Sequence, residues 1–224
     1  MAQSSVDLVS FIVGRSRIGL PMVAHRFGSK GRGRLLLIGG VHGDEPEGVV
    51  AANGLLASFA ESFEFALDVV VIPVFNPEGV IYGQRQNSAG VDLNRNMPTR
   101  DWSPEIKGPR YQPGPAPASE PESKALVKFL DEWKPSFVVS LHSWKPMLNT
   151  NGDCGEFAKI VAEKTGYTMA NDIGYPTPGS LGTYAGLERG MPTLTYEIER
   201  GLKLDQVVAI HVPAILSAMK ALEA

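Results

Sequence analysis

The stretch Arg34-Leu35-Leu36-Leu37-Ile38-Gly39-Gly40-Val41-His42-Gly43-Asp44-Glu45 joins an unbroken apolar run to two side chains that can bind metal. Residues 34–39 are typical of a strand that is buried on both faces, because such a strand has no solvent-facing positions that call for polar residues. His42 and Glu45 follow this run at a spacing of three. A His-x-x-Glu spacing arises easily by chance, so its interpretation depends on groups elsewhere in the chain.

Apolar strands alternate with helical patterns along the chain. After Pro46, which suits the first turn of a helix, apolar residues recur at helical spacing up to Phe59. Further strands are predicted at residues 69–75, 137–141 and 192–198, and further helices at 119–133, 154–165 and from 204 onward. This order predicts an α/β fold with a mixed, mainly parallel sheet that has helices on both faces.

Four segments carry more specific predictions. Residues 7–13 and 17–25 predict an opening pair of strands, and Ser119-Glu120-Pro121-Glu122 resembles a capping box. Residues 76–118 lack periodicity and are rich in proline, which predicts a long irregular loop of the kind that is usually functional or disordered. Residues 171–183 also read as irregular. Pro213 is expected to kink or interrupt the last helix.

Length and composition favour one globular domain over residues 1–224. The chain is 43% hydrophobic and carries a net charge of −3 without a long run of one sign, so we expect a small-molecule or peptide partner and neither nucleic acid nor membrane. The N-terminus lacks the pattern of a signal peptide, and no segment is expected to approach the roughly 18 apolar residues of a membrane span, so a cytoplasmic protein is expected. Cys154 lies on an apolar helical stripe and is predicted to be a core residue.

Two histidines and one glutamate are candidates for a metal site. In an open α/β sheet, ligands bind beyond the carboxyl ends of the strands. His42 and Glu45 follow one predicted strand, and His142 ends another. Two imidazoles and a carboxylate suit zinc with one position left for water, whose pKa the metal would lower toward about 7. His25 lies in a strand-like segment without candidate ligands nearby, and His211 lies on the apolar helical stripe of Val208, Val212 and Ile215, so both are expected to be structural.

An acidic strand near the C-terminus offers a general base. Thr193-Leu194-Thr195-Tyr196-Glu197-Ile198-Glu199 places two carboxylates in an otherwise apolar, β-prone segment. Alternation puts Glu197 and Glu199 on the same face, so the pattern alone does not choose between them. A carboxylate beside a metal-activated water can accept its proton and return it to a leaving amine. For Glu199, pairing with Arg200 or Arg189 at the surface is the favoured interpretation.

The long loop contributes candidate anion-binding groups. It holds Arg85 and then Gly90-Val91-Asp92-Leu93-Asn94-Arg95-Asn96. One guanidinium can clamp a carboxylate while another polarises a carbonyl group. Metal, base and clamp together indicate hydrolysis of an amide that lies beside a free carboxylate.

Taken together, these motifs resemble those of the zinc carboxypeptidases. The resemblance rests on segments that occur in the family's order, namely residues 40–45, Asn76-Pro77-Glu78-Gly79, Arg85, residues 90–96, Ser140-Leu141-His142-Ser143 and Thr195-Tyr196-Glu197. It implies that His42, Glu45 and His142 bind one Zn²⁺ and that Glu197, rather than Glu199, is the general base. It further implies that Arg85 stabilises the oxyanion of the scissile carbonyl. The remaining implied roles are in substrate binding, by Asn94 and Arg95 on the substrate carboxylate and by Ser143.

Within that family, Ser119–Glu122 and Gly174–Gly182 look most like the compact bacterial murein peptide amidases, which implies cleavage of the γ-D-glutamyl–diaminopimelate bond of recycled cell-wall peptides. Met97 and the charged segment Ile198-Glu199-Arg200 depart from the expected pattern. Tyr175 and Tyr184 are both candidates for a tyrosine that closes over the substrate. The sequence decides neither whether residues 98–118 form a lid over the site nor which oligomeric state the protein adopts. The alternatives are a deacylase of the succinylglutamate desuccinylase or aspartoacylase type and a non-catalytic peptide-binding module.

Overall fold

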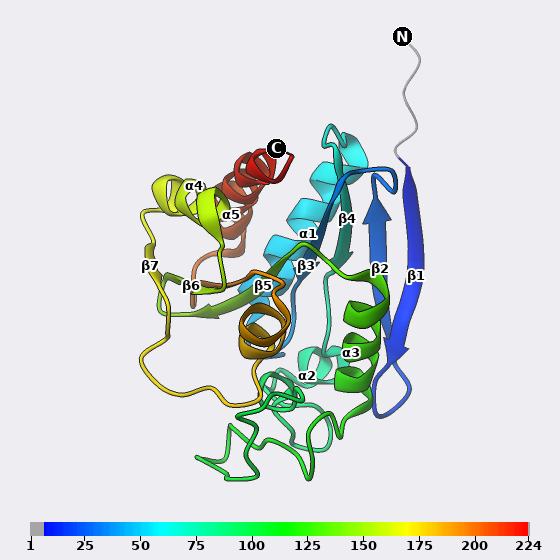
Figure 1. The fold of residues 1–224 in the computed structure, drawn as a ribbon, viewed down its shortest axis with the longest axis vertical. Coiled ribbons are helices and arrows are strands. Elements are labelled where there is room, and N and C mark those ends of the chain that lie inside the picture. The colour runs from blue at the N-terminus through cyan, green and yellow to red at the C-terminus, as the bar shows by residue number, and fades with distance from the viewer. Residues whose placement is uncertain (1–6, 224) are drawn as a thin grey trace.

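The computed structural model describes residues 7–223, which form one eight-stranded sheet in the order β1-β2-β4-β3-β5-β8-β6-β7 (Figure 1). The strands are β1 (Leu8–Arg15), β2 (Pro21–Phe27), β3 (Gly33–Ile38), β4 (Leu67–Ile72), β5 (Phe137–Trp144), β6 (Met147–Asn151), β7 (Thr168–Ala170) and β8 (Thr193–Glu199). The α-helices are α1 (Pro46–Glu61), α2 (Pro77–Tyr82), α3 (Pro121–Trp133), α4 (Gly155–Thr165) and α5 (Leu204–Met219). Three short helical segments complete the set: η1 (Leu93–Arg95), η2 (Gly182–Leu187) and η3 (Lys220–Leu222).

The four central strands, β4, β3, β5 and β8, run parallel, whereas β1, β2 and β6 add antiparallel pairings. Alternate residues of each central strand face opposite layers. Leu35 and Leu37 pack in a core with α1, α4 and α5, and Leu36 and Ile38 pack in a second core with α3 and η2. The predicted mixed, mainly parallel sheet with helices on both faces is confirmed.

The parallel strands bring the predicted site residues to one edge of the sheet. Ile38, the last residue of β3, pairs with Ser140 of β5, and His142 two residues later pairs with Glu197 of β8. Because parallel strands end on the same side, the turn after β3 lies beside His142 and Glu197. Backbone pairing alone therefore gathers groups that are far apart in the sequence.

The segment at residues 76–118 is more ordered than predicted, since it contains α2 and η1. Asn76 begins α2, its side chain accepts a hydrogen bond from the Gly79 amide, and Pro77 occupies the first turn. The strand predicted at 69–75 spans Leu67–Ile72 instead. It ends early because the chain turns so that the amides of Phe75 and Asn76 donate to carbonyls at the end of β3.

The predicted capping box at Ser119 is wrong. Helix α3 begins at Pro121, with Glu120 as N-cap residue and no side-chain cap. The Ser119 hydroxyl instead donates to Glu120, whose carboxylate also accepts from Asn87 and Arg17. Strands β6 and β7, and the π-helical turn η2, were not predicted. The expected irregular segment is confirmed only in the part that precedes η2.

Helix α5 continues through Pro213, so the predicted interruption of this helix is wrong. Leu204–Leu222 also has the length and mean hydropathy of a membrane span by composition alone, contrary to expectation. Its residues Val207, Val212 and Ile215 are buried in the core shared with α1 and α4. An apolar helix that packs in this way is typical of a globular core.

The residues expected to be structural take structural positions. His25 bonds the Ser10 hydroxyl across β1 and β2, and His211 is buried against the Tyr196 hydroxyl. Cys154 is buried, and burial raises the pKa of its thiol to about 11. None of the three lies in the site described below.

His211 makes the stability of the fold sensitive to acid. Its Nδ1 lies 2.6 Å from the Tyr196 hydroxyl, and burial lowers the pKa of His211 from 6.5 to about 4. Between these pH values the unfolded chain binds a proton at His211 that the folded chain does not bind. The free energy that neutral His211 contributes to folding is therefore complete above pH 6.5 and is lost as the pH falls toward 4.

We expect the His211→Gln variant to lose about 1 kcal/mol at neutral pH, because a buried hydrogen bond is weakened. Its free energy of unfolding should fall less than that of the wild type between pH 7 and pH 5. Urea denaturation of both proteins in EDTA measures this difference without a contribution from bound metal. Equal losses in the two proteins would contradict the assignment.

Candidate metal centre

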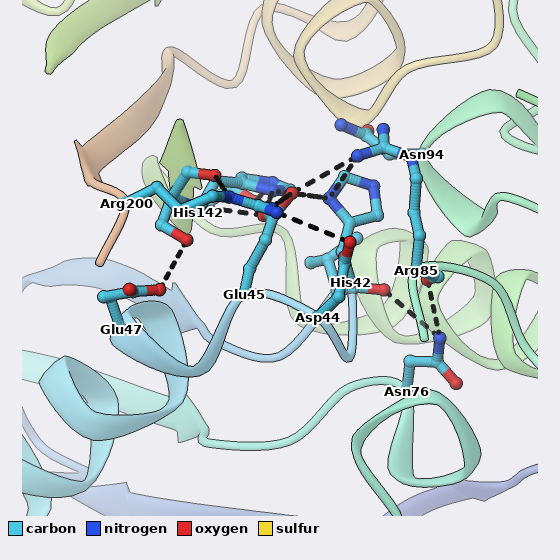
Figure 2. A network of polar contacts seen from close by, with 12 residues as sticks. His42, Asp44, Glu45, Glu47, Asn76, Arg85, Asn94, His142 and Arg200 are labelled. Carbon is cyan, nitrogen blue, oxygen red and sulfur yellow. Dashed lines mark hydrogen bonds and ion pairs between the residues drawn. The ribbon is translucent and has the colours of Figure 1, made fainter. Parts of the chain in front are cut away.

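His42, Glu45 and His142 converge at the edge of the sheet (Figure 2). All three side chains are buried, and their ligand atoms lie within 4.8 Å of one another. The Glu45 carboxylate lies between the two imidazoles, with Oε1 2.9 Å from His42 Nδ1 and Oε2 2.9 Å from His142 Nδ1. The two Nδ1 atoms are only 3.1 Å apart. Two ring nitrogens and one carboxylate therefore face a common point.

The far side of each imidazole is held by its own partner. His42 Nε2 lies 3.2 Å from Asp92 Oδ1, and His142 Nε2 lies 2.9 Å from the Ser140 hydroxyl. An acceptor at Nε2 keeps the proton there and leaves the Nδ1 lone pair free for a metal. Two imidazoles and a carboxylate match a zinc site with an open fourth position, so the residues present fit the predicted ion.

The turn that carries His42 and Glu45 requires glycine at position 43. A Cβ atom on Gly43 would lie 1.8 Å from the carbonyl carbon of Gly79 in α2. The Gly43 amide also donates to the Gln84 carbonyl at the end of α2. Close backbone approach thus fixes the metal-binding turn against a helix from the long loop.

Asp92 and Arg85 extend the network, and Asp92 received no role from the sequence. Asp92 is fully buried, and its Oδ2 accepts a bond of 2.9 Å from Arg85 Nε. Burial alone would raise the pKa of Asp92, but Arg85 and His42 outweigh it and hold the pKa below its usual range. Arg85 Nη1 reaches Glu45 Oε1 at 3.2 Å. The only sequence signal for Asp92 was its place within the segment 90–96.

Glu197 lies beside the ligands, whereas Glu199 does not. Glu197 is 8% exposed and lines the cavity next to its strand neighbour His142. Burial raises the pKa of Glu197 to about 7; the Glu45 charge adds to the rise, and His142 opposes it. Glu199 is exposed, as expected, but its predicted partners bind elsewhere: Arg189 pairs with Asp131, and Arg200 pairs with Asp44 and Glu45.

A cavity of about 420 Å³ opens above these groups. Asn94 and Arg95 line one wall, and the Asn94 side-chain oxygen accepts a bond from the Leu181 amide. The Arg95 guanidinium is stacked 5.4 Å from the centre of the Tyr111 ring and donates to the Asn94 carbonyl. Among residues 7–223, Arg95 forms no close ion pair, although its charge helps to lower the pKa of the buried Asp92 carboxylate.

The two tyrosines that were candidates for closing over the substrate occupy different environments. Tyr175 lines the cavity, and its ring lies near those of Trp144 and Tyr111. Tyr184 is buried in the second core, under the Arg189 guanidinium. Within the segment 98–118, Arg110 and Tyr111 contribute to the cavity wall.

Ser143 and Glu47 are further polar residues beside the candidate ligands, and the sequence indicated no role for Glu47. Ser143, which was predicted to bind substrate, lines the cavity. Its hydroxyl donates to Glu47 Oε2 at 2.6 Å, and its amide donates to Glu45. Glu47 also accepts from the Gly201 amide at 2.6 Å, which ties α1 to the end of β8. An acidic residue in the first turn of a helix is common, so nothing in the pattern marked Glu47 as a buried brace.

Comparison with known proteins agrees with this geometry. Residues 1–171 match the family described as zinc carboxypeptidase. The chain is 27% identical to murein peptide amidase A of Vibrio campbellii over 219 residues, covering 92% of this chain and 86% of that protein. It is 30% identical to murein peptide amidase A of Escherichia coli K12 over 184 residues, covering 76% and 74% of the two chains.

Solved structures show the same fold. The crystal structure of murein-tripeptide amidase from Escherichia coli O157 superposes with a TM-score of 0.76 at 25% identity, covering 96% of this chain and 92% of that one. Bovine thrombin-activatable fibrinolysis inhibitor gives a TM-score of 0.81 at 19% identity, covering 96% and 90%. Fold, ligand set and sequence agree that the chain is a metal-dependent hydrolase that uses zinc, and that it belongs to the zinc carboxypeptidase family.

Proposed function

We propose that this enzyme hydrolyses the γ-D-glutamyl–diaminopimelate amide bond of murein peptides. One observation carries the proposal: His42 and Glu45 line one cavity together with the buried carboxylate of Glu197 and the Arg95 guanidinium, and His142 lies beside them. The similar proteins named murein peptide amidase indicate the substrate class. His42, Glu45 and His142 are proposed as the three ligands of one Zn²⁺.

Glu197 is proposed as the general base. When bound, zinc supplies Lewis-acid polarisation and lowers the pKa of a water molecule in the open position. A carboxylate with a pKa near 7 is suited to accept a proton from that water and to return it to the leaving amine. A bound cation would lower the pKa of Glu197, which favours the ionised form that accepts the proton.

Arg85, Asn94 and Arg95 are proposed to handle the negative charges of the substrate. Arg85 is fixed by Asp92 and directs Nη1 toward the metal ligands, where it can stabilise the oxyanion of the scissile carbonyl. Arg95 and Asn94 are proposed to receive the carboxylate on the leaving side, because both line the cavity and a guanidinium can bind a carboxylate through two N–H donors. Tyr175 is proposed to close over the substrate. Substrate contact by Ser143 stays a prediction, since its hydroxyl already binds Glu47.

We also propose where in the cell the enzyme acts, from the substrate class proposed above. A catalytic domain that spans residues 1–224 and releases diaminopimelate from small peptides fits a cytoplasmic role in the recycling of cell-wall fragments. The net charge of −3 is spread without long runs of one sign, which supports a small peptide partner rather than nucleic acid.

Replacing Glu197 by Gln should strongly reduce turnover without removing zinc. We expect kcat/KM to fall by about 100-fold to 10,000-fold, because the amide does not accept the proton. Glu199→Gln, on the same strand but exposed, is the matched control and should keep wild-type turnover. Steady-state kinetics with metal analysis checks both. Full activity in Glu197→Gln would refute the assignment.

Replacing Asp92 by Asn should weaken zinc binding by about 10-fold to 100-fold, because the charge that orients the His42 imidazole is lost. Competition with a chelator measures the Kd for zinc. The exposed Asp153→Asn variant serves as the control for a change of net charge. An unchanged Kd in Asp92→Asn would show that Asp92 does not support the metal site.

The zinc-loaded enzyme should cleave L-alanyl-γ-D-glutamyl-diaminopimelate in preference to α-linked peptides and to N-succinylglutamate. Mass spectrometry of the products identifies the bond that is cleaved. Clear preference for N-succinylglutamate would favour the deacylase alternative. Peptide binding without turnover of any substrate would favour a non-catalytic module.

A further inference from the structure

Arg200 is a cation that the strand pairing places beside the metal ligands. It directly follows β8, and its amide donates to the Trp144 carbonyl at 3.0 Å. Its side-chain Nε donates to the Ser143 carbonyl at 3.2 Å, and Nη2 lies 3.2 Å from Glu45 Oε1. The side chain is 40% exposed and lines the cavity. Arg200 is thus anchored at its base and open to a ligand at its tip.

Arg200 and Arg85 approach the metal ligands from opposite sides. In Figure 2, Arg200 reaches Glu45 from the side of Glu47, whereas Arg85 and Asn94 lie on the other side of His42. Both guanidinium groups lie 3.2 Å from Glu45 Oε1. The cavity therefore presents positive charge on both sides of the point that the metal ligands face.

The charge of Arg200 is only loosely compensated. Its contact with Asp44 Oδ2 is long, at 3.5 Å, and the same oxygen accepts a bond of 2.6 Å from Arg110. Its other acidic neighbour, Glu45, is shared with Arg85 and belongs to the ligand set. A guanidinium has five N–H donors, so Arg200 keeps donors free for a substrate carboxylate.

The proposed substrate has a carboxylate on the acyl side of the scissile bond, and a cation such as the Arg200 guanidinium could bind it. A glutamyl residue linked through its γ-carboxyl keeps its α-carboxylate free, on the acyl side of the amide. The carboxylate on the leaving side is assigned to Asn94 and Arg95, and Figure 2 shows Asn94 on the other side of the candidate ligands from Arg200. A γ-linked substrate therefore presents two carboxylates that flank the bond, and the cavity presents two cationic walls.

We propose that Arg200 binds the free α-carboxylate of the γ-glutamyl residue and selects it over a neutral carboxamide. This inference rests on the proposed function and adds a specificity-determining residue to it. Arg110 is the nearest rival, but it belongs to the segment 98–118, is 51% exposed and is bound closely to Asp44. Arg200 alone combines a strand-end anchor with contact to the ligand set.

The test compares two peptides that differ in one charge. One is L-alanyl-γ-D-glutamyl-diaminopimelate, and the other is the same peptide with the glutamyl α-carboxylate converted to a carboxamide. We expect the zinc-loaded wild type to favour the acid in kcat/KM by about 10-fold to 100-fold, as for loss of a hydrogen bond to a charged group. Arg200→Gln should bring this ratio close to one by slowing hydrolysis of the acid, and Arg110→Gln should retain the wild-type ratio.

Binding supplies a second measurement that does not depend on turnover. Calorimetric titration of both peptides into zinc-loaded Glu197→Gln should show tighter binding of the acid, and the added Arg200→Gln change should remove the difference. Zinc content is measured in every variant, because Arg200 contacts Glu45. If Arg200→Gln does not fold or loses zinc, Arg200→Lys, which keeps the charge, should preserve part of the preference.

The outcomes separate the inference from the function on which it rests. A wild type that hydrolyses neither peptide contradicts the proposed function itself. Hydrolysis of both peptides at equal efficiency, or a preference that survives Arg200→Gln, overturns the role of Arg200 and leaves the proposed function standing. A preference that disappears only in Arg110→Gln reassigns the α-carboxylate to Arg110 and likewise overturns the inference.

Discussion

The buried carboxylate of Glu45 is the group around which the other polar side chains are arranged. Burial alone would raise the pKa of Glu45, yet His42 and His142 hold it well below its usual range. Arg85 and Arg200 add two further contacts to the same carboxylate. A buried charge is tolerated only when it is paired and hydrogen-bonded, so these residues depend on one another. A divalent cation adds positive charge to a site whose buried carboxylates are arranged to accept it.

The layers of the fold support this cluster from different directions. The Ser143 amide brings β5 to Glu45, and Glu47 joins the start of α1 to the end of β8. Asp92 reaches His42 and Arg85 from the long loop. Each brace comes from a separate part of the chain, which explains why a turn of only four residues can hold two candidate metal ligands in fixed positions.

Much of the fold and part of the candidate site could be predicted from the sequence. Apolar periodicity indicates which residues are buried, and the ends of strands indicate where ligand-binding residues lie. The strand after Gly33, the helix after Pro46 and the position of His142 all follow from such local patterns. Asp92 and Glu47 could not be found in this way, because their roles come from contacts with residues far away in sequence. The order within residues 76–118 was missed for the same reason.

Side-chain bonds, rather than periodicity, hold that segment. Asn76 caps α2, and the Asn96 side chain donates to the Pro113 carbonyl at 2.7 Å. Asn87 bonds Glu120 across the start of α3. Such bonds leave no repeating signal in a sequence, although asparagine beside proline does mark turns and helix starts. The resemblance to a known family was needed to prefer Glu197 to Glu199, since alternation treats the two alike.

The pairing of His142 with Glu197 across β5 and β8 has an evolutionary consequence. A candidate metal ligand and the proposed base lie on neighbouring strands, so the ladder of backbone hydrogen bonds sets their separation, and no loop has to do so. Much of the cavity wall comes from residues between 94 and 111 and between 171 and 187, outside the eight strands. New substrate preferences can therefore arise by exchange of these outer segments while the reacting groups keep their spacing, which makes the scaffold easy to diversify.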